Sequence, residues 1–357
     1  MKKRNHFVDI SKGLAIIMVT VTHYSWESAE RLQWYFPYWI SMAVPIFMIV
    51  TGVMSAASFE RRGVETLQGA YAPRLLVQKK IRYTMPFLCM FIAEVVLEWM
   101  RGHHYHPVQL CKLFVAGGIG VHGTYYYPVL MQLVFLIPVI WYIVKKWKWG
   151  IGACFLLNLT LEYWKNVIGM GREEYRLMAF RYIFAIAMGC FIHIYKDKKM
   201  TWTWILMWVV GTSYIWKVNY TDYKPEILNR WTNTSMMTIL YMAPIFVFGM
   251  KKLSQVKCKW LETIGKASYH IFLFQIIYYN FVGPYMMTWI GSRAAELVVS
   301  VAMCLAGGYG FYRVYNYVSE KVTAWYAKHK LYMKYRFFGI LRRTFGRKSW
   351  FARLRMG

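Results

Sequence analysis

About ten apolar stretches of membrane-spanning length dominate this sequence. They cover roughly residues 8–25, 35–58, 83–100, 125–144, 149–165, 177–195, 201–217, 233–250, 267–290 and 295–317. A helix needs about 20 mostly apolar residues to cross the hydrocarbon core of a bilayer. The chain is also 58% hydrophobic and only 17% charged, whereas a soluble domain is about 25% charged. The sequence therefore predicts an all-α integral membrane protein, a bundle of about ten transmembrane helices embedded in a lipid bilayer.

The net charge of +28 follows a pattern typical of membrane topology. When the N-terminus is placed in the cytoplasm, every inner segment is basic: the first four residues, 61–82, 145–148, 196–199, 251–259 and 321–355. Cytoplasmic loops of membrane proteins carry such an excess of Lys and Arg. A nucleic-acid-binding surface, the other common origin of a high positive charge, would not alternate with the apolar stretches. We therefore predict cytoplasmic N- and C-termini and no nucleic-acid partner.

A basic segment, residues 321–357, follows the last apolar stretch. It mixes Phe, Trp and Leu with many Arg and Lys residues. Such a segment lies on the anionic cytoplasmic leaflet as an amphipathic anchor, or stays solvated and only sets the orientation of the last helix. The predicted division is a transmembrane domain over residues 1–320 and a basic cytoplasmic tail over 321–357.

The first stretch, FVDISKGLAIIMVTVTHY (residues 7–24), carries polar groups at both ends. A charge at the bilayer centre costs roughly 2.5–3.5 kcal/mol, so ionisable groups in such a helix are candidates for function. Asp9 and His23 lie near one helix face but about 21 Å apart along the axis, so they cannot touch. The alternatives to a functional role are an interfacial ion pair between Asp9 and Lys12 and a hydrogen-bonded packing role for His23.

Three carboxylates lie near the predicted outer side of the membrane. Glu27 follows His23 by four residues; it would share the helix face of His23 and orient its imidazole, or it is the first loop residue. Glu94 and Glu98 share a face in the third stretch. They would bind sugar hydroxyls or form buried pairs, for which Arg181 is a candidate partner.

The inner segment RRGVETLQGAYAPRLLVQKKIRYTMPF (residues 61–87) concentrates basic residues before the third helix. It suits a lipid-headgroup anchor, and it also suits the phosphates of a cytoplasmic cofactor. By contrast, the HHYH segment (residues 103–106) has no spacing that brings its imidazoles together on a helix. We therefore predict no metal site there.

In chain order, five segments resemble the bacterial membrane acyltransferase family 3. The first stretch is similar to the opening pattern of the family, with Asp9, Lys12, Gly13 and His23 at the family spacing. VPIFMIVTG (residues 44–52) resembles the pattern of the second span, with Thr51 in place of the usual Ser. KKIRYTMPF (residues 79–87) resembles the basic start of the third span.

The other two segments depart further from the family. YYYPVLMQLVFLIPVI (residues 125–140) resembles the fourth-span pattern, with Tyr125 near the usual Trp. IGKASYHIFLFQ (residues 264–275) supplies Ser268 and Tyr269 of a Gly-x-x-Ser-Tyr-x-x-Tyr-Leu-x-His pattern. Phe272 and Gln275 replace the second Tyr and the His of that pattern. An amide forms hydrogen bonds but cannot shuttle a proton, so the family role of that His is in question here.

The resemblance implies an O-acyltransferase of the bacterial inner membrane. It would transfer an acyl group, which the family implies is acetyl, from cytoplasmic acetyl-CoA to a hydroxyl of an extracytoplasmic or lipid-linked sugar of a surface polysaccharide. The roles that it implies are these: His23 as general base or acyl carrier, with Glu27 beside it; Lys12, Lys80 and Arg82 on the CoA phosphates; Asp9, Thr51, Ser268 and Tyr269 in support; and Glu94, Glu98 and Tyr125 toward the sugar.

Two other classes of protein fit the same composition. A transporter or flippase for a lipid-linked sugar would also need about ten helices and buried charge, and a scaffold subunit would keep the motifs without their chemistry. Consumption of acetyl-CoA separates a transferase from both. No sequence feature sets the oligomeric state.

Overall fold

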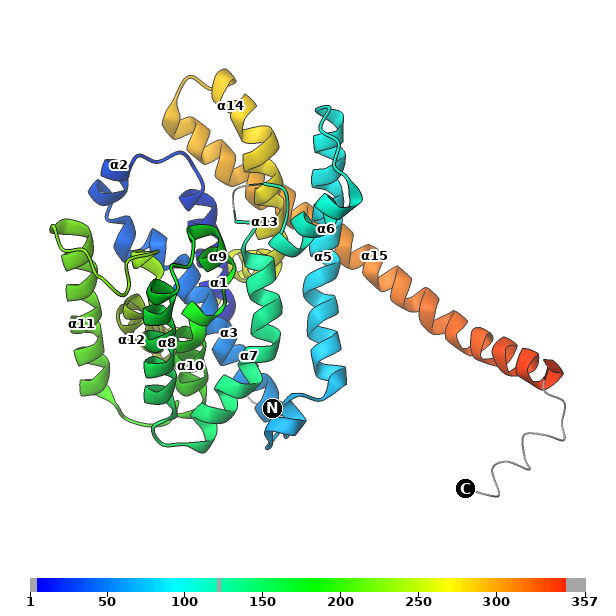
Figure 1. Ribbon diagram of the computed structural model, residues 1–357, viewed down its shortest axis with the longest axis horizontal. Helices are drawn as coiled ribbons and strands as arrows, with labels where there is room; N and C mark the ends of the chain where they lie inside the picture. The colour runs from blue at the N-terminus through cyan, green and yellow to red at the C-terminus, as the bar shows by residue number, and fades with distance from the viewer. Residues whose placement is uncertain (1–4, 121–122, 345–357) are drawn as a thin grey trace. The chain divides into compact units, whose positions relative to one another are not determined.

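The computed structural model describes residues 5–120 and 123–344, and Figure 1 shows their arrangement. The chain is 80% helical, and the described residues contain no strand. Two compact units divide at Tyr309. The second unit begins with Gly310, inside the long helix α15 (Arg293–Thr344), and residues 345–357 of the predicted tail lie outside the described residues.

Each predicted apolar stretch coincides with a helix. The long helices are α1 (His6–Thr22), α3 (Ala43–Arg61), α5 (Pro73–Met100), α7 (Tyr126–Lys146), α8 (Gly150–Val167), α10 (Ile183–Ile194), α11 (Thr201–Tyr220), α12 (Met236–Lys252), α13 (Lys259–Ile277) and α15. Four segments of the described chain are long and apolar enough to cross a membrane: Phe36–Arg61, Leu67–Met100, Tyr126–Lys146 and Arg293–Tyr326. The count of ten spans and the orientation of the ends stay predictions.

Short helices connect these elements. They are α2 (Ser28–Gln33), η1 (Phe36–Tyr38), η2 (Ile40–Met42), α4 (Leu67–Ala70), α6 (Pro107–Ala116), α9 (Arg172–Leu177), η3 (Phe180–Tyr182), η4 (Thr232–Thr234), the π-helical η5 (Tyr278–Val282) and α14 (Gly283–Trp289). Hydropathy predicts the start of the ninth stretch near residue 267, whereas α13 begins at Lys259. Its first turns carry Glu262 and Lys266, which hide the helix from an apolar pattern.

The core of the first unit forms around α10, which is buried along most of its length and packs on α3, α7, α8 and α12. Gly189 of α10 meets Gly52 of α3. A Cβ atom at either glycine would overlap the backbone of the other helix, at Ile49 and at Ile186 respectively. Small residues that let backbones approach are the usual contact between membrane helices.

Helix α1 packs closely on α13 through a second glycine pair. A Cβ atom at Gly265 would overlap the carbonyl oxygen of Asp9, and one at Gly13 would overlap that of Leu261. The imidazole of His6 pairs with Glu262, 3.1 Å away, at the start of both helices. The two helices therefore run in the same direction, and their later turns also meet near residues 20 and 279.

The first unit has two distinct ends. In Figure 1, α2 and α14 lie at the top of the view, whereas α5 begins at the bottom. At that lower end, Glu60 of α3 pairs with His193 of α10 and Glu65 pairs with Lys145 of α7. We call it the His6 end, because α1 starts there, and we call the other the His23 end. The predicted topology assigns the His6 end to the cytoplasm.

Candidate functional site

His23 follows the last residue of α1 and caps the helix through its backbone N–H, which donates to the carbonyl of Val19 at 3.3 Å. Its half-buried ring lies against the ring of Tyr279, with centroids 6.3 Å apart. A Cβ atom at Gly123 would lie 3.7 Å from Nε2 of His23 and 3.1 Å from the ring of Phe272. We call His23, Gly123, Phe272 and Tyr279 the His23 site.

A π-helical turn shapes one wall of the His23 site. Helix α13 continues into η5, which carries Tyr279. π-Turns inside helices recur at functional sites, because the extra residue turns side chains toward a new direction. Arg101 holds this turn from outside: its guanidinium donates to the carbonyl of Phe281 at 3.3 Å and lies 4.5 Å from the centre of that ring. Phe272 in turn packs on Tyr126, with ring centroids 4.7 Å apart.

Gln275 follows Phe272 by three residues and lies on the same face of α13. Its side chain is buried, with 1% of the residue exposed. Neither its amide oxygen nor its amide nitrogen has a hydrogen-bond partner within the described ranges, which omit residues 121 and 122. A buried amide without hydrogen-bond partners is unusual in a folded protein.

Glu94 holds the loop that carries Gly123. Its carboxylate is fully buried, and it accepts hydrogen bonds from the backbone N–H groups of Ile119 at 3.1 Å and Gly120 at 3.4 Å. A carboxylate accepts such bonds strongly, so Glu94 fixes the backbone just before the His23 site. The suggested pairing of Glu94 with Arg181 does not occur. Both groups are described, and they make other contacts.

The comparison with known families decides the class. The acyltransferase domain of family 3 matches residues 5–313 of the chain. The chain belongs to this acyltransferase family. Comparisons with curated proteins and with solved structures give no significant match. The family match covers α1, the loop of Gly123 and the turn η5, and therefore the whole His23 site.

Glu27 does not share a helix face with His23 in this acyltransferase, and the premise that it does is wrong. Helix α1 ends at Thr22, and Glu27 is the exposed N-cap residue of α2. It forms a capping box with Glu30, whose side chain accepts from the Glu27 N–H at 2.9 Å. Residues four apart share a face only along an unbroken helix, and α1 ends before Glu27.

Glu98 pairs with its neighbours in the chain. It contacts the guanidinium of Arg101 at 3.5 Å and the imidazole of His103. The other two histidines of the HHYH segment lie elsewhere: His104 packs on Trp99, and His106 caps α6. Among the described residues, no group of three His, Cys, Asp or Glu side chains could hold a metal ion.

Near the His6 end, the family motifs make structural contacts. Asp9 and Lys12 form an ion pair of 2.7 Å. The hydroxyl of Thr51 donates to the carbonyl of Phe47 at 2.7 Å, within α3. Tyr269 joins α13 to α5, because its hydroxyl donates to the carbonyl of Tyr83 at 2.9 Å. Ser268, beside it, is buried in α13.

The basic residues of α5 point in different directions. Lys80 and Arg82 are exposed, and the ammonium of Lys80 lies 4.5 Å from the ring centre of Phe135. Lys79 instead lines a narrow cavity of about 10 Å³ between α3, α5 and α7, near the least volume that holds one water molecule. Thr51, Ser55 and Tyr83 also line it. The family pattern points to Lys80 and not to Lys79. Two adjacent lysines cannot be told apart from the sequence, because packing sets which of them faces the interior.

Tyr125 faces a buried arginine at the His23 end. The guanidinium carbon of Arg181 lies 5.4 Å from the ring centre of Tyr125. Tyr125 is two residues after Gly123, so this candidate for contact with the sugar lies on the same loop as the His23 site. The family pattern alone points to Tyr125. For Arg181, the sequence suggests only a pairing with Glu94, and not the contact with Tyr125.

Proposed function

We propose that this acyltransferase moves an acetyl group from cytoplasmic acetyl-CoA to a hydroxyl of an extracytoplasmic or lipid-linked sugar of a surface polysaccharide. The observation that carries the proposal is the position of His23 within the family match. It lies at the end of α1, against a loop that Glu94 fixes, while the basic residues of α5 begin at the other end of the bundle. The enzyme would be a multi-pass protein of the bacterial inner membrane, with ten spans and both termini in the cytoplasm.

His23 is suited to the central step. Imidazole is the side chain that gains and loses a proton near neutral pH. In the proposed reaction, it takes the proton of the sugar hydroxyl as the oxygen attacks the thioester carbonyl. The carbon–sulfur bond breaks, and the proton passes to the departing thiolate of CoA. In the covalent variant, a nitrogen of the imidazole attacks the thioester carbonyl and CoA leaves as the thiolate. The sugar oxygen then attacks the acyl-imidazole, the nitrogen–carbon bond breaks, and the hydroxyl proton passes to the released imidazole. General base catalysis of this kind contributes about 10²–10⁴-fold in rate.

The donor would bind through cations at the His6 end. Arg82, Lys80 and Lys12 carry fixed positive charge suited to the phosphates of CoA. The ion pair with Asp9 holds Lys12 in place. The cavity that Lys79 and Thr51 line between α3, α5 and α7 supports the addition of Lys79 to this set.

The acceptor would approach from the His23 end. Glu94 acts there as a positioning residue, because its carboxylate is occupied by the backbone of residues 119 and 120. Glu98 holds His103 and Arg101 and so supports the turn that carries Tyr279. Tyr125 remains the candidate for direct contact with the sugar. Glu27, exposed on α2, is the weakest of the proposed catalytic residues.

Transfer of radiolabelled acetyl from acetyl-CoA tests the proposal. The wild-type protein, reconstituted in nanodiscs with a membrane extract of its host, should release CoA and label a glycan or glycolipid. His23→Ala should abolish transfer while acetyl-CoA affinity is retained. His23→Gln should also fail, because it keeps hydrogen bonding but not basicity. His104→Ala, an exposed histidine in a loop, is the matched control and should be active. Full activity of well-folded His23→Ala would refute the role of His23, and no use of acetyl-CoA by the wild type would refute the transferase.

A further inference from the structure

Arg181 lies inside a group of four aromatic rings at the His23 end, which we call the Arg181 cage. The residue is 97% buried, since only 3% of its surface is exposed. Its guanidinium carbon lies 4.0 Å from the ring centre of Trp231, 4.5 Å from Tyr182, 5.4 Å from Tyr125 and 5.5 Å from Tyr175. Rings at these distances attract a cation through their negative faces, but they do not neutralise its charge.

The charge of Arg181 has no counter-ion in the part of the chain that the structure describes. Its Nη2 donates to the hydroxyl of Tyr182, whereas Nε and Nη1 have no hydrogen-bond partner among the described residues. The other nearby side chains, Tyr125 and Tyr175, are phenols and so cannot supply a negative charge near neutral pH. A buried charge without a partner is strongly disfavoured. An anion supplied from outside the chain would remove this penalty.

The carboxylate that reaches the cage is already engaged. Glu162 accepts from the hydroxyl of Tyr175 at 2.9 Å and pairs with the buried ammonium of Lys165 at 3.1 Å. Arg176, on the neighbouring helix α9, pairs with Glu173 at 3.0 Å. Glu162 and Glu173 are therefore each paired with another cation, and no ion pair to Arg181 forms among the described residues.

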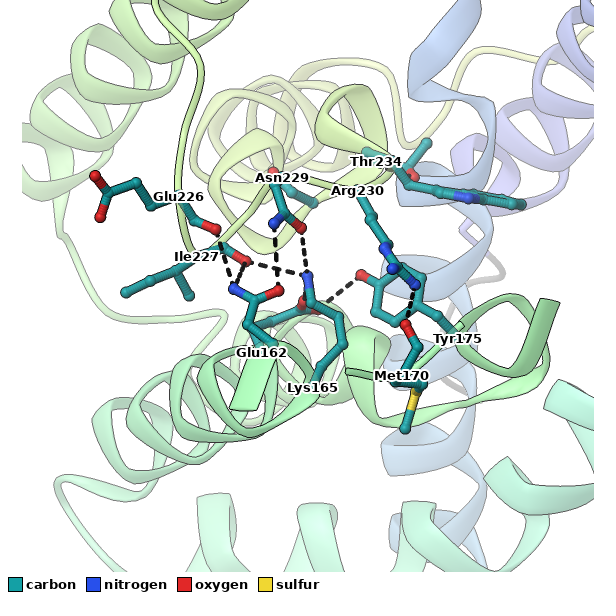
Figure 2. A network of polar contacts seen from close by, with 12 residues as sticks. Glu162, Lys165, Met170, Tyr175, Glu226, Ile227, Asn229, Arg230 and Thr234 are labelled. Atoms are coloured by element: carbon teal, nitrogen blue, oxygen red, sulfur yellow. Dashed lines mark hydrogen bonds and ion pairs between the residues drawn. The ribbon is translucent and has the colours of Figure 1, made fainter. Parts of the chain in front are cut away.

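The surrounding structure holds the cage in place. Figure 2 shows Lys165 reaching the segment before Trp231: its ammonium donates to the carbonyl of Ile227 at 3.1 Å and to Asn229 at 3.0 Å. Arg230 donates to the carbonyl of Met170. Trp231 itself has a φ of +50°, a left-handed conformation that bulky residues rarely adopt. Backbone strain of this kind persists where the surroundings impose it, commonly at ligand sites.

The segment before Arg181 is fixed as well. The amide of Gln132, on α7, donates to the carbonyl of Leu177 at 2.7 Å and accepts from the N–H of Ala179 at 3.0 Å. Arg181 therefore enters the cage from a backbone that is anchored two residues earlier. A residue held this firmly suits recognition, because little freedom is lost when a ligand binds.

The cage and the His23 site share a loop. Tyr125 follows Gly123 by two residues, which span at most about 7 Å of extended chain. The next residue, Tyr126, packs on Phe272 of the His23 site. Tyr125 and Trp231 are half-exposed, and their rings meet edge to face with centroids 5.1 Å apart. They form the accessible side of the cage.

We infer that the Arg181 cage binds an anionic group of the sugar acceptor, a carboxylate or a phosphate attached to the sugar, while Trp231 and Tyr125 stack on the sugar ring. The inference rests on the proposed function, because it makes the cage the acceptor subsite beside His23. A carboxylate and a phosphate offer guanidinium the same chemistry, a planar or tetrahedral set of oxygens that accept charge-assisted hydrogen bonds. The first would belong to an acidic sugar and the second to a sugar phosphate.

Binding of small sugar probes to the purified wild-type protein in detergent tests the inference. Glucuronate, glucose 1-phosphate and glucose are compared by titration calorimetry at one ionic strength. At least one charged probe should bind about tenfold or more tightly than glucose. Preference for glucuronate assigns the carboxylate of an acidic sugar, and preference for glucose 1-phosphate assigns a sugar phosphate. Equal affinity for all three probes, or no binding of any, overturns the inference.

Variants then locate the binding. Arg181→Gln should lose the preference for the charged probe, and Trp231→Leu should weaken charged and neutral probes alike. Arg172→Gln, which removes an exposed charge from the neighbouring helix α9, is the matched control and should bind as the wild type does. If Arg181→Gln does not fold, Trp231→Leu tests the inference instead. Loss of probe binding in Trp231→Leu would support the Arg181 cage as the binding site, and unchanged binding would overturn it. His23→Ala should bind the charged probe normally, so failure of the inference and failure of the proposed acetyl transfer give different results.

Discussion

The hydroxyl of Tyr279 donates a hydrogen bond to the backbone carbonyl of Thr20, 2.7 Å away and three residues before His23. This bond joins the π-helical turn η5 to the last turn of α1. The same tyrosine ring lies against the imidazole of His23. The position of His23 therefore depends on a residue far away in the sequence.

We expect Tyr279→Phe to lower the turnover of acetyl transfer about fivefold. A lost hydrogen bond of about 1 kcal/mol leaves α1 less firmly joined to η5, and 1.4 kcal/mol corresponds to tenfold in rate. Steady-state kinetics should show a change in kcat and an unchanged KM for acetyl-CoA. The matched control is Tyr278→Phe, which removes a similar bond to Ser300 at 3.0 Å outside the His23 site. An equal loss in both variants would indicate a general effect on stability.

Gly123→Ala should inactivate the enzyme while the protein still folds. The backbone at Gly123 has a φ of +78°, and the new Cβ atom would crowd the Phe272 ring and His23. Gly63→Ala separates the two effects, because Gly63 also has a positive φ, +63°, but open space around its Cβ direction. Transfer should be retained in Gly63→Ala. Normal transfer in Gly123→Ala would show that this loop does not limit the reaction.

Three variants of α5 should rank the cations that bind the donor. Arg82→Ala should weaken acetyl-CoA binding, since a fixed planar cation is lost. Lys79→Ala should weaken it too, because Lys79 lines the cavity next to Thr51. Lys80→Ala should do least, since its ammonium rests on Phe135 at the surface. Direct binding of acetyl-CoA in detergent measures the order. Unchanged affinity in Arg82→Ala would leave this segment as a lipid anchor.

Gly189→Ala should lower the unfolding temperature of the protein in detergent. Its Cβ atom would overlap the backbone of Ile49 and force α10 away from α3. Gly152→Ala is the control within another helix, with nothing near its Cβ direction, and should raise stability slightly, by about 0.5–1 kcal/mol. A thermal unfolding curve for each variant checks both signs.

The predicted topology can be checked by cysteine labelling of intact cells. Lys198→Cys, between α10 and α11, should be shielded from an impermeant thiol reagent, and Lys224→Cys, after α11, should react with it. The exposed native thiols Cys89 and Cys111 are first replaced by Ser. Labelling of Lys198→Cys from outside would reverse the assignment of the two ends.

The sequence alone determined the class of fold and the position of most helices. The reason is that a backbone in hydrocarbon must satisfy its own hydrogen bonds, so a long apolar stretch has to be helical. The helix α13 was placed late because its first turns carry charge. The sequence also pointed to His23, since ionisable groups are rare inside apolar stretches and the family pattern includes this one.

The tertiary structure decided which side chains meet. In the folded chain, α1 ends before Glu27, and the carboxylate of Glu94 accepts hydrogen bonds from the backbone of a loop. Lys79, rather than Lys80, lines the cavity. The tertiary structure also gathered the Arg181 cage from four separate parts of the chain. Helical periodicity encodes which residues share a face of one helix, but not how far that helix extends or which helix it faces. Those relationships arise from close packing, at Gly13 against Gly265 and at Gly52 against Gly189, and packing depends on residues far apart in the sequence.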